Sequence, residues 1–154
     1  MTCVKVKRIG NHTLPLPRYE TEGAAGFDLR ACIDNTIGGV VLYGVGMPKV
    51  VGCGFAFEVP EGYELQIRPR SGLSRDGVHV ALGTVDSDYR GEVKICLSVE
   101  GSNQFWINHG DRIAQGIIAP VVRAELVEVD TLSETARGAG GFGSTGTGAG
   151  EVAT

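Results

Sequence analysis

The sequence has few of the residues on which several common functions depend. Of its 154 residues only 6% are aromatic, and 14 lysines and arginines stand against 18 aspartates and glutamates, which gives a formal net charge of -4. This acidic balance argues against binding along a nucleic-acid backbone, which needs a basic surface. It is compatible with a small polyanionic ligand held by a few arginines.

Metal-binding patterns of cysteine and histidine are also missing. The four cysteines, Cys3, Cys32, Cys53 and Cys96, form no CxxC pair and do not cluster with the three histidines. Zinc-ligand spacing is therefore absent. We expect reduced, partly buried thiols in a cytoplasmic protein, or one of the host-cell cytoplasm if the source is viral. Since no apolar run is long and continuous, we expect neither a signal peptide nor a membrane as partner.

No window of helical length keeps a helical apolar period, so at most one or two short helical turns are expected. Strand signals recur instead at intervals of about 8 to 12 residues, which predicts an all-β jelly roll or distorted β-barrel. The length suits one domain with a sizeable core. The expected strands are residues 3–9 and 24–31, two hairpins within residues 55–67 and 78–99, and a last strand over residues 121–129.

The composition changes near the C-terminal end. From Arg137 the chain reads Arg-Gly-Ala-Gly-Gly-Phe-Gly-Ser-Thr-Gly, and such a segment cannot bury enough apolar surface to order itself. We expect a β-rich domain over residues 1–136 and a flexible Gly-rich arm over residues 137–154. A GxGxxG match in the arm has no room for the helix of a dinucleotide fold, and Ser144 stands where a Walker loop has lysine. The remaining amides, hydroxyls, cation and aromatic ring suit closure over a phosphorylated, planar ligand.

Three short motifs admit a structural explanation beside a chemical one. Residues 83–91 carry Asp86 and Asp88, which either form ordinary turns or present a carboxylate on the loop of a rigid hairpin. Residues 70–72, Arg-Ser-Gly, either form a surface turn or offer a guanidinium, a hydroxyl and open amides to phosphate oxygens. Asp28 either holds water around a cation or caps a turn.

Two neighbouring segments suggest structural roles. Asp111 and Arg112 are adjacent and are expected to form an ion pair, while Gln115 offers a neutral donor. Phe105 and Trp106 are expected in the core, where large aromatic side chains bury most area.

Taken together and in this order, five motifs resemble those of the trimeric dUTP pyrophosphatase (dUTPase) family. They are residues 25–29, 69–73, 83–91, 110–115 and 137–146. The resemblance runs from about residue 4 to residue 146. It implies a jelly-roll homotrimer that hydrolyses dUTP to dUMP and pyrophosphate with Mg2+, with active sites shared between subunits. Such an activity limits uracil incorporation into DNA and supplies dUMP for dTMP synthesis.

The resemblance also implies roles for individual residues. Asp86 would be the base that activates the water attacking the α-phosphorus, a task that suits a carboxylate. Tyr89 would lie under the deoxyribose and exclude a 2'-hydroxyl. Main-chain groups of Gly83, Thr84 and Val85 would pair with the uracil edge.

The other implied contacts concern the phosphates, the arm and the metal. The residues expected at the phosphate chain are Arg70, Ser71, Gly72 and Gln115. Those expected from the arm are Arg137, Ser144 and Thr145 at the terminal phosphate, with Gly143 beside them and Phe142 stacked on uracil. Mg2+ would bind the three phosphates directly and Asp28 only through water, so no direct protein ligand is expected.

The chain departs from the family pattern in two places. Phe27 stands where a tyrosine is often found. Residues 80–83, Val-Ala-Leu-Gly, are a short version of the approach to the third motif and lack the asparagine that some members place near the base. Two other functions remain open: a dCTP deaminase-like enzyme of the same fold, and a nucleotide-gated regulatory binding protein.

Overall fold

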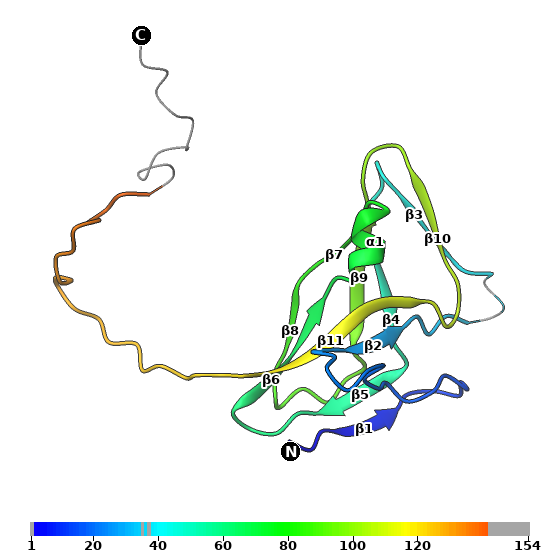
Figure 1. The fold of residues 1–154 in the computed structure, drawn as a ribbon, viewed down its shortest axis with the longest axis horizontal. Coiled ribbons are helices and arrows are strands. Elements are labelled where there is room, and N and C mark those ends of the chain that lie inside the picture. The colour runs from blue at the N-terminus through cyan, green and yellow to red at the C-terminus, as the bar shows by residue number, and fades with distance from the viewer. Residues whose placement is uncertain (1, 35, 37, 142–154) are drawn as a thin grey trace, which may run out of the picture. The chain divides into compact units, whose positions relative to one another are not determined.

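The strands expected from the alternation of apolar and polar residues are present. The structure is a computed structural model and describes residues 2–34, 36 and 38–141. The chain divides into two compact units, Met1–Val122 and Arg123–Thr154. Among the described residues, all strands and the helix belong to the first unit, which is drawn with its labels in Figure 1.

The described residues of the first unit form eleven short strands and one helix of five residues. The strands are β1 (Lys5–Arg8), β2 (Phe27–Arg30), β3 (Val40–Tyr43), β4 (Lys49–Gly52), β5 (Phe55–Glu58), β6 (Tyr63–Arg68), β7 (Val78–Val80), β8 (Gly83–Val85), β9 (Lys94–Val99), β10 (Gln104–Ile107) and β11 (Arg112–Pro120), and the helix is α1 (Ser71–Arg75). The expectation of very little helix is confirmed. Within the described part of the chain, no helix has the length and hydropathy to cross a membrane.

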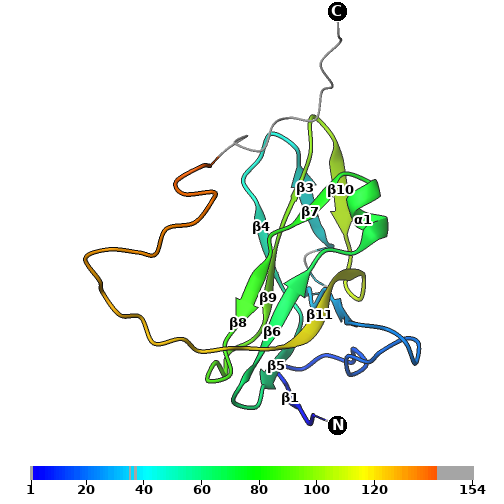
Figure 2. The ribbon, with the colours of Figure 1, turned by 60° about the vertical axis from the view of Figure 1, so that its left-hand side comes forward.

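The strands form four small antiparallel sheets. Their orders are β1-β5, β10-β3, β2-β11-β6-β8 and β4-β9-β7. Figures 1 and 2 show the β3–β10 pair and α1 towards one end of this unit and the β1–β5 pair towards the other. This nearly all-β arrangement confirms the predicted jelly-roll class.

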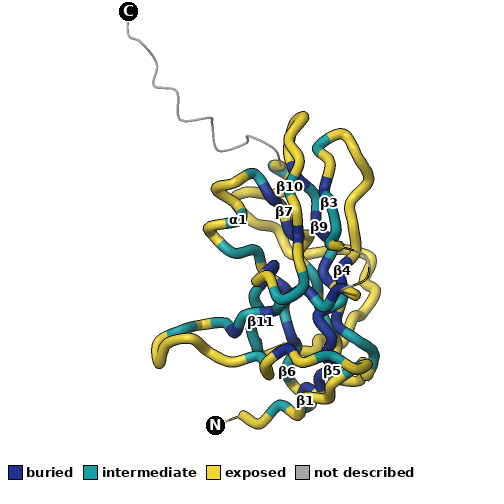
Figure 3. The backbone as a smooth tube through the Cα atoms, turned by 90° about the vertical axis from the view of Figure 1, so that its right-hand side faces the viewer, coloured by how far each residue is buried: buried dark blue, intermediate teal, exposed yellow. Residues whose placement is uncertain are grey.

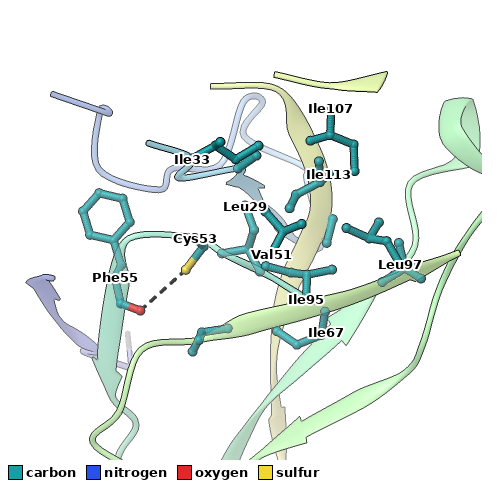
Figure 4. Close-up of a cluster of buried hydrophobic side chains, with 14 of the residues drawn as sticks. Leu29, Ile33, Val51, Cys53, Phe55, Ile67, Ile95, Leu97, Ile107 and Ile113 are labelled. Carbon is teal, nitrogen blue, oxygen red and sulfur yellow. Dashed lines mark hydrogen bonds between the residues drawn. The ribbon is translucent and has the colours of Figure 1, made fainter. Parts of the chain in front are cut away.

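The core forms where the inward faces of these sheets meet. In β9, for example, Ile95, Leu97 and Val99 are buried while the residues between them are not, as period-2 alternation requires. Figure 3 shows buried positions along the strands and exposed positions on most of the turns. Figure 4 shows part of the resulting cluster, including the buried Cys53, whose thiol donates to the Phe55 carbonyl at 3.5 Å.

The first predicted hairpin is wrong in its pairing, although both strands exist. β5 pairs with β1, and β6 pairs with β11 and β8, so the two strands joined at Pro60–Gly62 belong to different sheets. Three consecutive residues of β5 are buried, which shows that both of its faces are covered. Alternation predicts a strand but not its neighbour, because the partner is set by the tertiary fold.

The second predicted hairpin is confirmed in part. β7 pairs with β9 through Val78 with Val99 and Val80 with Leu97. Residues 83–85 are not part of a loop, however, because they form β8 and pair with β6 in another sheet. The chain therefore crosses between sheets in the two residues that separate β7 from β8.

The predicted strand over residues 121–129 is wrong for this chain. The Val121 amide still donates to the Gly62 carbonyl at 2.8 Å, but the described residues form no strand after Pro120. Leu126 and Val127 are 93% and 68% exposed. A strand needs partners for its backbone groups, and within the described chain this segment has no backbone hydrogen bond beyond the one at Val121.

Trp106 was also predicted wrongly as a core residue. It pairs with Val41 on the outer face of the β3–β10 pair and is 59% exposed. Its neighbour Phe105 faces the other way and packs against the core, as expected. Since successive residues of a strand point to opposite faces, only one of these two aromatic side chains can be buried.

Candidate active site

A polar hollow of about 290 Å³ lies where β2, α1 and β11 come together. It collects residues from the first, second and fourth of the predicted motifs. The lining residues are Glu20, Ala24, Gly26, Asp28, Arg70, Ser71, Gly72, Arg112 and Gln115. All four residues expected at the phosphate chain, Arg70, Ser71, Gly72 and Gln115, therefore line the same hollow.

Asp28 holds two guanidinium groups at this hollow. Its Oδ1 atom lies 2.9 Å from Arg70 Nε, and its Oδ2 atom accepts a hydrogen bond from Arg112 Nη1 at 3.2 Å. The Asp28 side chain is only 14% exposed, against 28% for Arg70 and 45% for Arg112. Asp28 and its two arginines together carry a net charge of +1, and Glu20, which also lines the hollow, is paired with Arg18 at 3.4 Å. The two guanidinium groups therefore remain able to attract an anionic ligand.

The expected ion pair between Asp111 and Arg112 is wrong. Arg112 reaches Asp28 instead, and the Asp111 carboxylate accepts the backbone N–H of Asn108 at 2.8 Å. Adjacent residues at the start of a strand point apart, so neighbours in sequence seldom pair there. Arg112 was consequently missed as part of the site, although β11 carries both it and Gln115 to the hollow.

Gln115 is fixed by the sheet and by its own amide. It lies opposite Asp28 on β2 and Arg68 on β6, and its Nε2 donates to the Pro69 carbonyl at 2.9 Å. A Cβ atom on Gly26 would lie 2.9 Å from Gln115 Oε1. A side chain at position 26 would thus crowd the Gln115 amide and also approach the Gly116 carbonyl at 3.1 Å.

Ser71 and Gly72 begin α1 and are both exposed. The helical turn closes through the Ser74 amide, which donates to the Arg70 carbonyl at 3.0 Å. A Cβ atom on Gly72 would meet no atom within 4 Å. This opening leaves the hydroxyl and the amides of the turn accessible to a ligand.

Asp86 does not lie at the hollow within one chain. β8 runs antiparallel to β6, with Gly83 opposite Ile67 and Val85 opposite Leu65. Asp86 thus follows the end of β8 that points away from Arg68 and α1. At roughly 3.3 Å per residue, Leu65 and Arg68 alone are separated by about 10 Å. Figure 2 shows α1 and the turn after β8 towards opposite ends of the sheet.

The loop that carries Asp86 is short and internally bonded. The Tyr89 amide donates to the Asp86 carbonyl at 3.1 Å, and the Tyr89 hydroxyl donates to the Glu92 carbonyl at 3.1 Å. Asp86 itself is exposed. A carboxylate fixed on a rigid turn and open to solvent is suited to accept a proton from water.

β8, the strand expected to pair with the uracil edge, is joined to β7 by the two residues Ala81 and Leu82. Thr84 is exposed while Gly83 and Val85 are partly buried. In the link the Ala81 amide donates to the Cys96 carbonyl at 3.0 Å, and Leu82 is 73% exposed. Neither link side chain carries a polar group, so the link itself offers only main-chain donors and acceptors.

Of the arm residues, Arg137 is described and four others are not. The Arg137 guanidinium donates from Nε to the Gly140 carbonyl at 2.9 Å, and the Gly140 amide donates to the Arg137 carbonyl at 3.0 Å. These bonds close a turn within the second unit. The expected arm residues Phe142, Gly143, Ser144 and Thr145 lie outside the described residues.

The carboxylate nearest the hollow, Asp28, bears on how a Mg2+ ion could be held there. Among the residues that the structure describes, no three His, Cys, Asp or Glu side chains are grouped to hold a metal. Both Asp28 oxygens already face guanidinium groups. Mg2+ retains water readily and often binds substrate phosphates with few protein ligands, so this donor set suits an ion carried by a polyphosphate.

The part of the chain that is similar to known proteins includes all five motifs. The dUTPase family model matches residues 12–146. The deoxyuridine 5'-triphosphate nucleotidohydrolase of Rhizobium rhizogenes is 54% identical over 136 residues, covering 86% of this chain and 86% of that protein. The protein of the same name from Nautilia profundicola is 50% identical over 146 residues, covering 93% and 98%.

A solved structure shares the fold at lower identity. A variant of the Staphylococcus bacteriophage 80alpha dUTPase, determined with dUpNHpp, superposes with a TM-score of 0.82 at 24% identity, covering 95% of this chain and 99% of that one. The fold and the sequence relatives agree: this chain belongs to the dUTPase family.

Proposed function

We propose that this protein hydrolyses dUTP to dUMP and pyrophosphate, which limits uracil incorporation into DNA and supplies dUMP for dTMP synthesis. The observation that carries the proposal is its 54% identity to a deoxyuridine 5'-triphosphate nucleotidohydrolase over most of both chains. The hollow adds physical support, because its two guanidinium groups and amide side chain suit phosphate oxygens.

In this proposal the triphosphate lies along the hollow. Arg70 and Arg112 attract its charge, Gln115 donates from a neutral amide, and Ser71 and Gly72 offer a hydroxyl and an open backbone. Asp28 keeps the two arginines 2.9 and 3.2 Å from its carboxylate oxygens. Preset donors of this kind need no rearrangement as charge develops on the phosphates.

Asp86 is proposed as the base that takes a proton from the attacking water. The Tyr89 ring would lie under the deoxyribose and leave no space for a 2'-hydroxyl. Main-chain groups of Gly83, Thr84 and Val85 would pair with the uracil edge. The apolar link before β8 supports this assignment to the main chain, because it offers no side-chain amide.

The arm is proposed to close over the bound nucleotide. Arg137, Ser144 and Thr145 would contact the terminal phosphate, Gly143 would allow close approach of the backbone, and Phe142 would stack on uracil. We assign the flexible arm to residues 137–154 and the enzymatic domain to residues 1–136. Closure of such a segment excludes water from the reacting groups and opens again for release.

We propose a homotrimer whose active sites are shared between subunits. The pairing of β8 with β6 supports it, since Asp86 follows the end of β8 that lies away from α1 and the hollow of its own chain. A neighbouring copy can supply the carboxylate to that hollow. The exposed apolar residues after Pro120 are a second feature that contact with another copy would cover.

Mg2+ is proposed as the cofactor. When bound, it would neutralise phosphate charge and orient the phosphate chain, with Asp28 contributing only through a water molecule. The free cysteines suit a reducing compartment, and we propose the cytoplasm as the location.

The activity is tested by measuring pyrophosphate release from dUTP and from the four common deoxynucleotides, with and without Mg2+. We expect rapid release from dUTP alone, and only with the metal. Ammonia release from dCTP would instead indicate a deaminase. No reaction with dUTP would refute the proposed function.

The shared site has its own test. Asp86→Asn subunits and subunits truncated before Arg137 should each have strongly reduced activity when assembled alone. Refolded together, they should recover partial activity, because some sites then receive an intact Asp86 and an intact arm from different chains. Failure to recover activity in a mixture that assembles would exclude a site built from several subunits.

A further inference from the structure

A carboxylate outside the hollow is bound to the backbone of a neighbouring segment. Glu92 directly follows the loop that carries Asp86, and its Oε1 accepts the backbone N–H of Gly54 at 2.8 Å. A Cβ atom on Gly52 would collide with the same carboxylate. The segment between β4 and β5 is therefore shaped to receive the Glu92 side chain.

The site that receives this carboxylate is itself fixed from its other side. The Gly54 carbonyl accepts hydrogen bonds from His12 Nε2 at 2.8 Å and from the Ile9 amide at 2.8 Å. Gly54 has a φ of +76°, and a Cβ atom on it would lie 2.9 Å from the Cys32 thiol. Its backbone consequently has little freedom, which makes it a firm attachment point.

On the loop side, Glu92 is linked to Tyr89. The Tyr89 hydroxyl donates to the Glu92 carbonyl at 3.1 Å. A Cβ atom on Gly91 would collide with that hydroxyl, so the ring lies close over the glycine. The position of the Glu92 backbone thus sets the position of the Tyr89 ring.

Hydrogen bonds also connect the rest of the loop to Tyr89. The Arg90 guanidinium donates to the Ser87 carbonyl at 2.6 Å and to the Tyr89 carbonyl at 2.9 Å. The Tyr89 amide donates to the Asp86 carbonyl at 3.1 Å. Residues 86–92 are therefore held together by internal hydrogen bonds, and the Glu92 side chain attaches this loop to residues 52–54.

We propose that Glu92 is a positioning residue for hydrolysis. Its carboxylate fixes the loop on Gly54, and the loop in turn fixes the Asp86 carboxylate and the Tyr89 ring. The inference rests on the proposed roles of Asp86 and Tyr89. Glu92 acts without contacting the nucleotide, so its loss affects the rate and the choice of sugar more than the binding of phosphates.

Three variants separate the features of this side chain. Glu92→Ala removes the contact, and Glu92→Asp keeps the charge but is one methylene too short to reach the Gly54 amide. Glu92→Gln keeps an oxygen acceptor of the same length. The matched control is Glu100→Ala, which removes an exposed carboxylate that pairs with His79 at 2.8 Å, away from the loop.

The main measurements are kcat and KM for dUTP, and the ratio of kcat/KM for dUTP to that for UTP. Because misplacement of a reacting group by about 1 Å costs on the order of 10²-fold in rate, we expect Glu92→Ala and Glu92→Asp to lower kcat by about 10- to 100-fold. In both variants the ratio of kcat/KM for dUTP to that for UTP should fall, while KM for dUTP stays nearly unchanged. Glu92→Gln should recover most of both quantities, and Glu100→Ala should match the wild type.

Amide hydrogen exchange of residues 86–92 without nucleotide tests the attachment independently of activity. Exchange should accelerate in Glu92→Ala and Glu92→Asp and stay slow in Glu92→Gln. If Glu92→Ala does not fold, the Asp and Gln variants decide the question. Wild-type kcat and sugar discrimination in Glu92→Asp would overturn the inference, as would unchanged exchange. Wild-type protein that leaves dUTP intact would instead refute the proposed function.

Discussion

Replacing Asp28 by asparagine tests the charge arrangement of the hollow most directly. The two carboxylate oxygens face Arg70 at 2.9 Å and Arg112 at 3.2 Å. An asparagine side chain has the same shape but offers only one oxygen acceptor. Its NH2 group would face the N–H groups of the other guanidinium, and two donors cannot form a hydrogen bond with each other. At least one arginine therefore loses its partner and the local net charge rises by one.

The expected loss of stability follows from burial. Hydrogen bonds to charged groups contribute roughly 1.5–3 kcal/mol, and removing one partner of a fully buried pair costs about 3–5 kcal/mol. Arg112 is 45% exposed, so water replaces much of its lost contact. We expect a loss of about 2 kcal/mol, which for a chain of this size lowers the midpoint of thermal unfolding by about 4–8 °C.

Thermal unfolding at one fixed protein concentration measures this shift, because assembly makes the midpoint depend on concentration. Glu58→Gln is the matched control, since Glu58 pairs at 2.6 Å with an exposed Lys5 and should change the midpoint little. Misaligned guanidinium groups should also lower kcat/KM for dUTP by about 10²-fold. An Asp28→Asn protein with the midpoint and kcat/KM of the wild type would refute the arrangement described here.

Three further changes have expected outcomes. Asp86→Asn should retain nucleotide affinity and slow pyrophosphate release by roughly 10²- to 10⁴-fold, the usual contribution of one general base; near-normal turnover would remove Asp86 from the mechanism. Tyr89→Ala should narrow the preference for dUTP over UTP, and unchanged discrimination would disprove its role at the sugar. Burial raises the pKa of the Cys53 thiol from 9.0 to about 12. Because the unfolded thiol ionises first, the stability associated with this group is present below pH 9 and is lost as the pH rises towards 12. Urea unfolding of Cys53→Ala between these limits should show a shallower loss than the wild type, and parallel curves would contradict the assignment.

Much of the strand content could be predicted because alternation records which face of a segment is buried. Ile95, Leu97 and Val99 follow this rule in β9. The same rule failed for the hairpin at Pro60–Gly62, because the pattern does not say which strand covers which face. It also failed for Trp106, whose size suggested burial although its position in β10 places it on the outer face.

The site was predictable to the extent that its residues occur in compact motifs. Arg70, Ser71 and Gly72 were found in this way, and so was Gln115. Arg112 was missed because its partner, Asp28, is distant in sequence, and the nearer Asp111 was the obvious candidate. Glu92 was missed for a similar reason, since its contact with Gly54 joins segments that only the fold brings together.

The hollow without Asp86 and the exposed apolar segment after Pro120 would both be completed by contact with another copy of the chain. The hollow holds cationic and neutral donors for phosphates, whereas β8 carries Asp86 towards the other end of β6. The residues after Pro120 expose apolar side chains such as Leu126 and Val127 without a strand partner in the described chain. Burying that apolar surface against another copy gains free energy in proportion to its area, and the same association can bring a carboxylate to each hollow. Assembly and catalysis would then depend on one set of contacts, so dilution that dissociates the copies should abolish turnover even though each chain keeps its β-rich core.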